Sequence, residues 1–430
     1  MNGLLIKNAL IVNPKGKYKG AGDIFVRGGV IARIAPSIDG NGETVIDASG
    51  LTALPGLVDM HCHLREPGFE YKETIATGTR AAARGGFTTV ACMPNTDPPA
   101  DTPSVITFIR KKAAEEGAVR VLPVGCITRE QKGKELAEMG ALRAAGAVAL
   151  SDDGMPVADS HVMHMALRYA RSFGMLLISH CEDPGLVNGG VMNEGYWSTL
   201  LGLKPITRAA EEVMVARETL LAQALDTRVH IAHVSTEGAC AVIRSAKARG
   251  VKVTAETCPH YFSATDAFVD GFDTNAKVNP PLRTDADVAA VKAALKDGTL
   301  DCIVTDHAPH HIDQKAVEFD VAANGISGFE TAFSLAYTNL VKTGVLTLDQ
   351  LVTRMACNPA AVLGIDGGVL MEGGRADIVL VNENETYAID ASDFVSKGKN
   401  TPFDGTEVTG RVLHTIAGGR LVVEAGRVVI

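Results

Sequence analysis

A repeating pattern of apolar and polar positions runs from about Leu54 to Gly364. Each unit begins with a short apolar run, continues through a polar cluster and ends in a segment of helical periodicity that stops at glycine. Residues 102–117 and 206–225 are typical of these helices, and Pro103 suits a first helical turn. The apolar runs number eight: LPGLVDMHCH, FTTVACMPN, VRVLPVGC, AVALSDDG, MLLISHCE, VHIAHVS, VKVTAETCPH and LDCIVTDHAPH. Eight strands alternating with helices predict an α/β fold, a (β/α)8 barrel over residues 55–365.

The two ends of the chain have a different pattern. Residues 1–54 and 366–430 alternate short β-rich runs with glycine and Asn-Pro turns, and they show no helical period. This pattern predicts a small antiparallel sheet at each end. Because both ends share the pattern and flank the repeats, we expect them to form one small β domain beside the barrel.

Composition narrows the function classes. Hydrophobic residues make up 46% of the chain and mean hydropathy is +0.12, which indicates a large buried core. The formal net charge is −9 without a cluster of Lys or Arg, so the chain is not suited to nucleic acid or an acidic membrane. No apolar run reaches the length of a membrane helix, and eight cysteines lie scattered without a CxxC pair. We expect a cytoplasmic protein with reduced thiols.

Ionisable residues gather where the predicted strands give way to loops. In a (β/α)8 barrel these strand ends meet at the mouth that carries active sites. His161 and His164 also have ligand-like spacing, but they lie on a predicted helix away from the mouth and are interpreted as ordinary helix residues. The strand-end set is His61, His63, Asp152, Asp153, His180, His233, His260, Asp306, His307 and His310. Imidazoles and carboxylates from separate strand ends predict a metal site.

The spacing suggests two metal ions. His61 and His63 are two residues apart on one strand, so both face the same side and form a three-ligand set with Asp306. His180 and His233 give a second ion two ligands, and Asp153 is placed to bridge both ions. Two cations about 3.5 to 4 Å apart share a hydroxide, because bound zinc lowers the pKa of water to about 7. Asp306 then serves as the catalytic general acid and base.

Taken together, these motifs resemble a known family. HCHLREPG, MPNT, SDDG, SHCED, AHVST, ETCPH, KVNPPLR and TDHAPH are similar to the class I dihydroorotases of the amidohydrolase superfamily. The resemblance covers nearly the whole chain and implies a metal-dependent barrel with a β-sandwich domain built from both ends. It also implies two Zn²⁺ ions per subunit, bridged by Asp153 and hydroxide. Related hydantoinases and allantoinases usually bridge their metals with a carbamylated lysine, and AVALSDDG contains none.

The resemblance also implies a reaction and its contacts. The reaction is closure of N-carbamoyl-L-aspartate to L-dihydroorotate and water in pyrimidine biosynthesis. Arg65 is implied to bind the ring carboxylate with help from Asn95 and His310, while His260 is interpreted as a residue that orients a ligand and Asp152 as a loop support. The full set of implied substrate contacts is His63, Leu64, Arg65, Asn95, Asn279, His310, Asn324 and Gly325.

Two alternatives to this function stay open. One is another cyclic amidase that acts on allantoin, hydantoin or dihydrouracil, which the missing lysine and Arg65 disfavour. The other is a non-catalytic scaffold, which is disfavoured because all six metal ligands are present. The family resemblance implies a homodimer and an association with aspartate transcarbamoylase.

Overall fold

Eight parallel strands form the centre of the molecule. The computed structural model describes residues 3–40 and 42–430. Each central strand forms within one apolar run, and almost every strand residue is buried except in β8, where three of the four residues are half-buried. The strands are β6 Leu57–Cys62, β7 Phe87–Cys92, β8 Arg120–Pro123, β9 Ala149–Ser151, β10 Leu176–Ser179, β13 Val229–Ile231, β14 Val253–Thr257 and β15 Cys302–Ile303.

These strands close into a barrel. β6, β7 and β8 form one hydrogen-bonded set, and β9, β10, β13, β14 and β15 form another. Parallel bridges join the sets at both seams, between Gly125 and Leu150 and between Cys62 and His307. The predicted (β/α)8 barrel is therefore confirmed.

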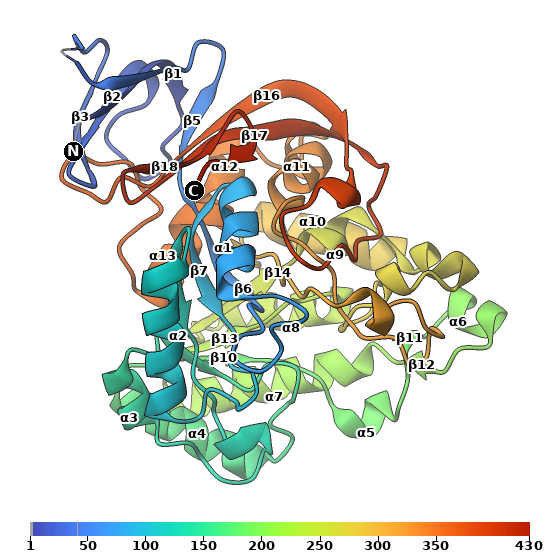
Figure 1. Cartoon of the computed structure of the whole chain (residues 1–430). Helices are drawn as coiled ribbons and strands as arrows, with labels where there is room; N and C mark the ends of the chain where they lie inside the picture. The colour runs from blue at the N-terminus through green and yellow to red at the C-terminus, as the bar shows by residue number, and fades with distance from the viewer. Residues whose placement is uncertain (1–2, 41) are drawn as a thin grey trace.

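Helices surround the strands (Figure 1). The predicted helices over 102–117 and 206–225 form as α2 and α7, and α2 begins at Pro103 as expected. His161 and His164 lie on α4 Ser160–Ser172, as predicted for helix residues. The longer helices are α1 Ile75–Arg84, α2 Pro103–Glu116, α3 Met139–Ala145, α4 Ser160–Ser172, α7 Ala209–Leu225, α8 Glu237–Ala248 and α10 Asp285–Asp297. None of the helices in the described part of the chain is long and apolar enough to cross a membrane.

Shorter elements fill the connections. An excursion after β10 contains α5 Pro184–Val187, β11 Met192–Asn193, α6 Tyr196–Leu201 and β12 Pro205–Ile206. α9 Pro259–Ser263 follows β14, and α11 Ala332–Ala336, α12 Leu348–Val352 and α13 Asn358–Leu363 follow β15. π-helical turns η5 Tyr337–Val341 and η6 Thr353–Cys357 lie among the last three helices. All eight cysteines are free and buried.

The two chain ends share one sheet, seen at one side of the barrel where blue and red strands meet (Figure 1). β16 pairs with β5 and so joins the two ends, in the order β19-β18-β17-β16-β5-β1-β2-β3 with β4 beside β1. Its strands are β1 Leu4–Ile11, β2 Gly20–Arg27, β3 Val30–Ala35, β4 Thr44–Asp47, β5 Thr52–Pro55, β16 Ile378–Ala388, β17 Glu407–Ala417, β18 Arg420–Glu424 and β19 Arg427–Val428. The expectation of a purely antiparallel sheet was wrong, because β1 pairs with β4 and β5 in parallel. The domain limits at residues 54 and 365 stay a prediction.

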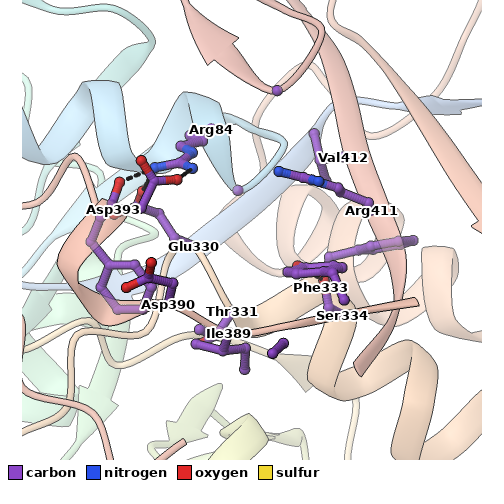
Figure 2. A pocket seen from close by; sticks show the side chains of 15 residues that line it. Arg84, Glu330, Thr331, Phe333, Ser334, Ile389, Asp390, Asp393, Arg411 and Val412 are labelled. Atoms are coloured by element: carbon purple, nitrogen blue, oxygen red, sulfur yellow. Dashed lines mark hydrogen bonds and ion pairs between the residues drawn. The ribbon is translucent and has the colours of Figure 1, made fainter. Parts of the chain in front are cut away.

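A small polar cavity lies where the long hairpin of β16 and β17 packs against the barrel. Figure 2 shows Arg84 of α1 meeting Glu330 and Asp393 at one end of this cavity. Arg84 Nη1 lies 3.1 Å from Glu330 Oε1, and Arg84 also pairs with Asp393. The Glu330 carboxylate accepts hydrogen bonds from the backbone amides of Val395 and Ser396 at 2.8 and 3.1 Å. Glu330 therefore ties the connection between β16 and β17 to the barrel.

We predict that Glu330→Ala destabilises the protein. The change removes the acceptor for two partly buried amides and for Arg84, and unpaired donors away from water cost free energy, so the free energy of unfolding should fall by about 2 to 4 kcal/mol. Urea denaturation measures this change. Glu115→Ala is the matched control, because Glu115 is exposed on α2, and it should change stability by less than about 0.5 kcal/mol. Equal stability of the two variants would contradict the docking role of Glu330.

Candidate metal centre and substrate cavity

The predicted metal ligands come from five different strands of the barrel. His61 lies on β6 and His63 directly follows it. The others follow their strands by one to three residues: Asp153 after β9, His180 after β10, His233 after β13 and Asp306 after β15. Because parallel strands end at the same rim, barrel closure brings residues far apart in sequence into one cluster.

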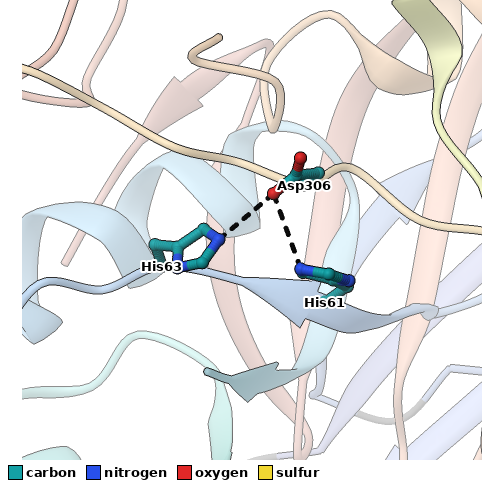
Figure 3. Close-up of side chains that lie close together, drawn as sticks. All are labelled: His61, His63 and Asp306. Carbon is teal, nitrogen blue, oxygen red and sulfur yellow. Dashed lines mark hydrogen bonds and ion pairs between the residues drawn. The ribbon is translucent and has the colours of Figure 1, made fainter. Parts of the chain in front are cut away.

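His61, His63 and Asp306 form the first group (Figure 3). Asp306 Oδ1 lies 3.1 Å from His63 Nε2 and 3.6 Å from His61 Nε2. Both rings reach the same carboxylate, so the expectation that they face one side is met. Cys62 between them turns away, and its thiol donates to the carbonyl of Ala91 at 3.3 Å.

Asp153 lies between this group and the remaining two imidazoles. Its Oδ1 is 3.2 Å from His61 Nε2, 3.5 Å from His233 Nε2 and 3.6 Å from His180 Nδ1. Its Oδ2 is 3.4 Å from His63 Nε2. One carboxylate therefore faces all four histidines, which is the geometry a bridging ligand requires.

The cluster fits divalent cations. His61 Nε2 and Asp153 Oδ1 are buried and have no hydrogen-bond partner, although buried polar atoms are normally paired. Facing ring nitrogens of His180 and His233 lie only 2.7 Å apart, as expected of two rings turned toward one point. Ligand atoms of His61, His63 and Asp306 lie within 4.8 Å of one another, as do those of His61, Asp153 and His233. Nitrogen and oxygen donors in this number are typical of a zinc-type centre.

Both carboxylates are ionised and therefore able to bind cations. Burial raises the pKa of Asp306, but the hydrogen bond with His63 and the charge of His61 outweigh burial and lower the pKa to about 2. For Asp153, burial is likewise outweighed by the surrounding imidazoles, so its pKa lies well below its usual range. His233 and Asp306 have φ angles of 32° and 45°, a left-handed conformation that non-glycine residues adopt mainly at turns and functional sites.

A cavity of about 170 Å³ opens beside these ligands. Every predicted site residue lines it except His61, which is fully buried, and Leu64, whose side chain packs in the hydrophobic core. The lining consists of His63, Arg65, Asn95, Asp153, Gly154, His180, His233, Val278, Asn279, Asp306, Ala308, His310, Asn324 and Gly325. The metal cluster and the residues implied to contact substrate therefore share one space.

Arg65 supplies the positive charge of this cavity. Its side chain is buried, and its guanidinium donates to the carbonyl of Pro309 at 3.3 Å and lies 3.2 Å from His310 Nε2. No carboxylate in the described residues lies within salt-bridge distance of it. Burial lowers the pKa of Arg65 to about 10, which still leaves it charged at neutral pH. A buried cation without a carboxylate partner is suited to binding an anionic group.

Comparison with known proteins assigns the chain to a family. A family model described as Dihydro-orotase-like matches residues 50–239. The dihydroorotase of Acetivibrio thermocellus is 55% identical over 420 residues, covering 98% of this chain and 99% of that protein. The dihydroorotase of Pelotomaculum thermopropionicum is 56% identical over 421 residues, covering 98% of both. The chain belongs to the dihydroorotase family. The resemblance of its motifs to this family is thereby confirmed.

Solved structures support the fold of this dihydroorotase-family chain. The L-hydantoinase (dihydropyrimidinase) of Arthrobacter aurescens superposes with a TM-score of 0.90 at 27% identity, covering 100% of this chain and 98% of that one. The D-hydantoinase (dihydropyrimidinase) of a Thermus species gives 0.86 at 26% identity, with 99% and 96% covered. The chain therefore has the amidohydrolase architecture, and its His and Asp groups support a requirement for a divalent metal.

Three carboxylate or amide groups orient the histidines of this dihydroorotase-family site. Glu256 Oε1 lies 2.6 Å from His61 Nδ1, and its other oxygen lies 3.0 Å from His230 Nε2. Asn95 Oδ1 lies 2.8 Å from His63 Nδ1, and Glu182 Oε2 lies 3.3 Å from His180 Nε2. An acceptor on the outer ring nitrogen leaves the lone pair of the inner nitrogen for a metal.

Sequence reasoning missed two of these groups. Glu256 and Glu182 both stand within quoted motifs, ETCPH and SHCED, but received no role. Glu182 could have been found from its position two residues after His180. Glu256 gives no such signal, because it is 195 residues from its partner His61. Asn95, predicted only as a substrate contact, also orients a ligand.

Asp152 and His260, which were predicted to support the site, differ in their hydrogen bonding. Asp152 holds the loop as expected, because its carboxylate accepts from the backbone amides of Ile127 at 2.7 Å and Thr128 at 3.1 Å. The interpretation of His260 as an orienting residue stays a prediction, because its buried Nε2 makes no hydrogen bond to a proposed metal ligand. Burial lowers the pKa of His260 to about 4, so the ring is neutral. It lies near Cys258 and Asp306 instead.

A left-handed turn sets the orientation of the Arg65 side chain. β6 ends at Cys62, and Arg65 has a φ of 62°. Because Arg65 lies beyond the end of the strand, the alternation of side chains along β6 does not set its direction. The left-handed turn directs the Arg65 side chain toward Pro309 and His310 instead. The remaining contact residues are also held in place, since Asn279 Nδ2 donates to Glu182 at 3.2 Å and the carbonyl of Asn324 lies 2.8 Å from His310 Nε2.

We predict that Glu256→Gln weakens metal binding by about 10- to 100-fold. The amide cannot accept equally from His61 and His230, so the His61 ring loses its fixed orientation. Metal content after dialysis against graded chelator concentrations, measured by elemental analysis, tests this expectation. Glu330→Gln is the control, because Glu330 is a buried carboxylate with no hydrogen bond to a proposed metal ligand. Identical metal retention in both variants would remove Glu256 from the metal site.

Proposed function

We propose that this chain catalyses the reversible closure of N-carbamoyl-L-aspartate to L-dihydroorotate and water, a step of pyrimidine biosynthesis. The observation that carries the proposal is the cavity in which Arg65, a buried cation without a carboxylate partner, faces the His and Asp cluster. Dihydroorotate has the matching chemistry, with a ring carboxylate at one end and a cyclic amide at the other. Relatives at 55% identity over almost the whole chain are named dihydroorotase, which supports the same substrate.

The polar end of the cavity binds the carboxylate in this proposal. Arg65 contributes a charged donor, and Asn95 and His310 lie beside it in the lining. Burial lowers the pKa of His310 to about 2, with the charge of Arg65 acting in the same direction, so its ring is neutral and forms hydrogen bonds without competing charge. The ring of the substrate contacts Asn279 and the segment Asn324–Gly325. His63 completes the proposed contacts from the cavity lining, whereas the predicted contact Leu64 lies outside that lining.

The cyclic amide of the substrate lies beside the proposed metal ligands. We propose two Zn²⁺ ions per subunit, held by His61, His63, Asp153, His180, His233 and Asp306, with Asp153 between them. When bound, such ions supply a water-derived nucleophile at neutral pH and polarise the amide carbonyl. The orphaned nitrogen of His61 and oxygen of Asp153 support this assignment.

Asp306 moves the proton. In hydrolysis the oxygen of water adds to the ring carbonyl carbon, the carbon–nitrogen bond breaks, and Asp306 passes a proton from water to the departing nitrogen. In synthesis the same steps run in reverse. Closure of the ring consumes a proton together with the carboxylate oxygen, so acid favours dihydroorotate and alkali favours the open chain. The depressed pKa of Asp306 keeps its carboxylate ionised at neutral pH, which is the protonation state that an initial proton acceptor needs.

A second candidate function is a hydantoinase or allantoinase. The names of the solved neighbours favour it, since they are hydantoinases with TM-scores up to 0.90. Two observations support the first candidate instead. The strand end of β9 presents Asp153 and no lysine, and Arg65 gives the cavity a cation that an uncharged ring does not need. A scaffold without activity is the weakest candidate, because the six proposed ligands lie close together.

The cellular setting belongs to the same proposal. We propose a cytoplasmic homodimer that associates with aspartate transcarbamoylase. An enzyme that makes the open-chain substrate is the natural neighbour of one that closes it.

The first test is a panel of cyclic amides. Zinc-loaded protein should hydrolyse L-dihydroorotate at alkaline pH and leave hydantoin, allantoin and dihydrouracil almost unchanged, because only the first carries a carboxylate for Arg65. Absorbance of the ring amide measures the rate, and a chelator-treated sample should lose more than about 90% of it. Preferred turnover of another ring would assign the protein to the second candidate, and no turnover with metal bound would favour the scaffold.

Arg65→Ala should raise KM for dihydroorotate at least about tenfold, because charge-assisted hydrogen bonds contribute about 1.5 to 3 kcal/mol each. Metal content should stay the same, since the Arg65 guanidinium bonds Pro309 and His310 and no proposed ligand. Steady-state kinetics and elemental analysis measure the two effects. Arg244→Ala, at an exposed ion pair with Asp297, is the control and should leave KM unchanged. An unaltered KM in Arg65→Ala would exclude Arg65 from the substrate site.

A further inference from the structure

One side chain from outside the barrel holds the rim of the cavity together. The rim comprises Ala308, His310, Asn324 and Gly325, which line the end of the cavity near Arg65. Asn400 lies in the connection between β16 and β17, on the part of the chain that belongs mainly to the sheet. It does not line the cavity, but its side chain is buried against the rim.

The amide of Asn400 bonds the rim through both of its ends. Its Nδ2 donates to the carbonyls of Gly325 at 2.9 Å and Ala308 at 3.2 Å. Its Oδ1 accepts from the backbone amide of His310 and from Ser327 Oγ, both at 3.0 Å. These four bonds use both donors and both acceptor positions of the side chain. Asn400 thus bonds both segments of the rim, which also contact each other directly through Ala308 N and the Ile326 carbonyl at 2.9 Å and through His310 Nε2 and the Asn324 carbonyl at 2.8 Å.

The backbone segments that Asn400 joins are closely packed. Gly325 has a φ of 146°, and a Cβ there would lie 2.5 Å from the carbonyl oxygen of Ala308. The connection itself passes equally close, since a Cβ on Gly398 would lie 2.6 Å from Pro309 Cβ. The backbone segments are therefore in direct contact, and their spacing depends on the hydrogen bonds between them.

Two carboxylates of the barrel hold the connection that carries Asn400. Glu330 accepts from the amides of Val395 and Ser396, and Glu73 accepts from Ser396 Oγ at 2.5 Å. These two buried carboxylates of the barrel anchor the connection four residues before Asn400. The sheet-forming end of the chain therefore contributes structure to the cavity.

We propose that Asn400 is a positioning residue for substrate binding, which sets the distance between His310 and Gly325 so that both meet the substrate beside Arg65. This role rests on the proposed function. None of the four bonds of Asn400 reaches a proposed metal ligand, so the residue acts on binding of the carboxylate-bearing ring and leaves the metal centre intact.

Two substitutions test this role. Asn400→Ala removes the link, and Asn400→Asp keeps its size but places a carboxylate oxygen against the carbonyls of Ala308 and Gly325. Both should raise KM for L-dihydroorotate about tenfold or more, with kcat within about threefold and metal content unchanged. A residue that merely fills space would tolerate the aspartate, so a raised KM in Asn400→Asp is the distinguishing result.

Asn13→Ala is the matched control. Asn13 is also fully buried and uses both amide ends, but both bonds go to Leu370 at 2.7 and 3.1 Å, outside the cavity. Its variant should lower the melting temperature and leave KM within about twofold of wild type. Wild-type KM in both Asn400 variants, loss of metal in them, or an equal KM rise in Asn13→Ala would each overturn the proposal. A wild-type protein inactive on dihydroorotate would overturn the proposed function itself, and this role with it.

Discussion

The cost of burying charge governs this structure. Asp153 and Asp306 are almost completely buried, and an isolated carboxylate in such surroundings is strongly unfavourable. Four imidazoles and the cations they are suited to hold offset this cost, but only if five strand ends meet at one place. Closure of the barrel at both seams satisfies this condition. The cluster of metal-ligand side chains therefore depends on closure of the barrel.

A second layer of polar residues extends the same principle. Glu256 lies fully buried between His61 and His230, where each group lowers the cost of burying the others. Burial raises the pKa of Glu256, but the charges of both rings outweigh it and lower the pKa to about 2. The orientation of a metal ligand is thus linked to the interior of the barrel. Such fixed ligands reduce the reorganisation that metal binding requires.

The cavity has two chemically distinct ends. The end formed by His and Asp side chains is suited to cations and to the amide that reacts, while the end formed by Arg65 and His310 is suited to an anion. Separate support serves each end: barrel residues orient the metal ligands, and the connection between β16 and β17 holds the rim through Asn400. The barrel and the sheet are consequently one functional unit, although different parts of the chain form them.

Local pattern alone determined the eight strands, the helices over 102–117 and 206–225, and the six metal-ligand candidates, because hydrophobic periodicity and strand-end positions are properties of neighbouring residues. Tertiary structure alone decided the partners. Glu256 meets His61 across 195 residues and Asn400 meets His310 across 90, so no local spacing could reveal either pair. The left-handed turn at Arg65 and the unpartnered Nε2 of His260 likewise depend on which segments closure brings together. Hydrogen bonds act over about 3 Å in space, whatever the separation along the chain.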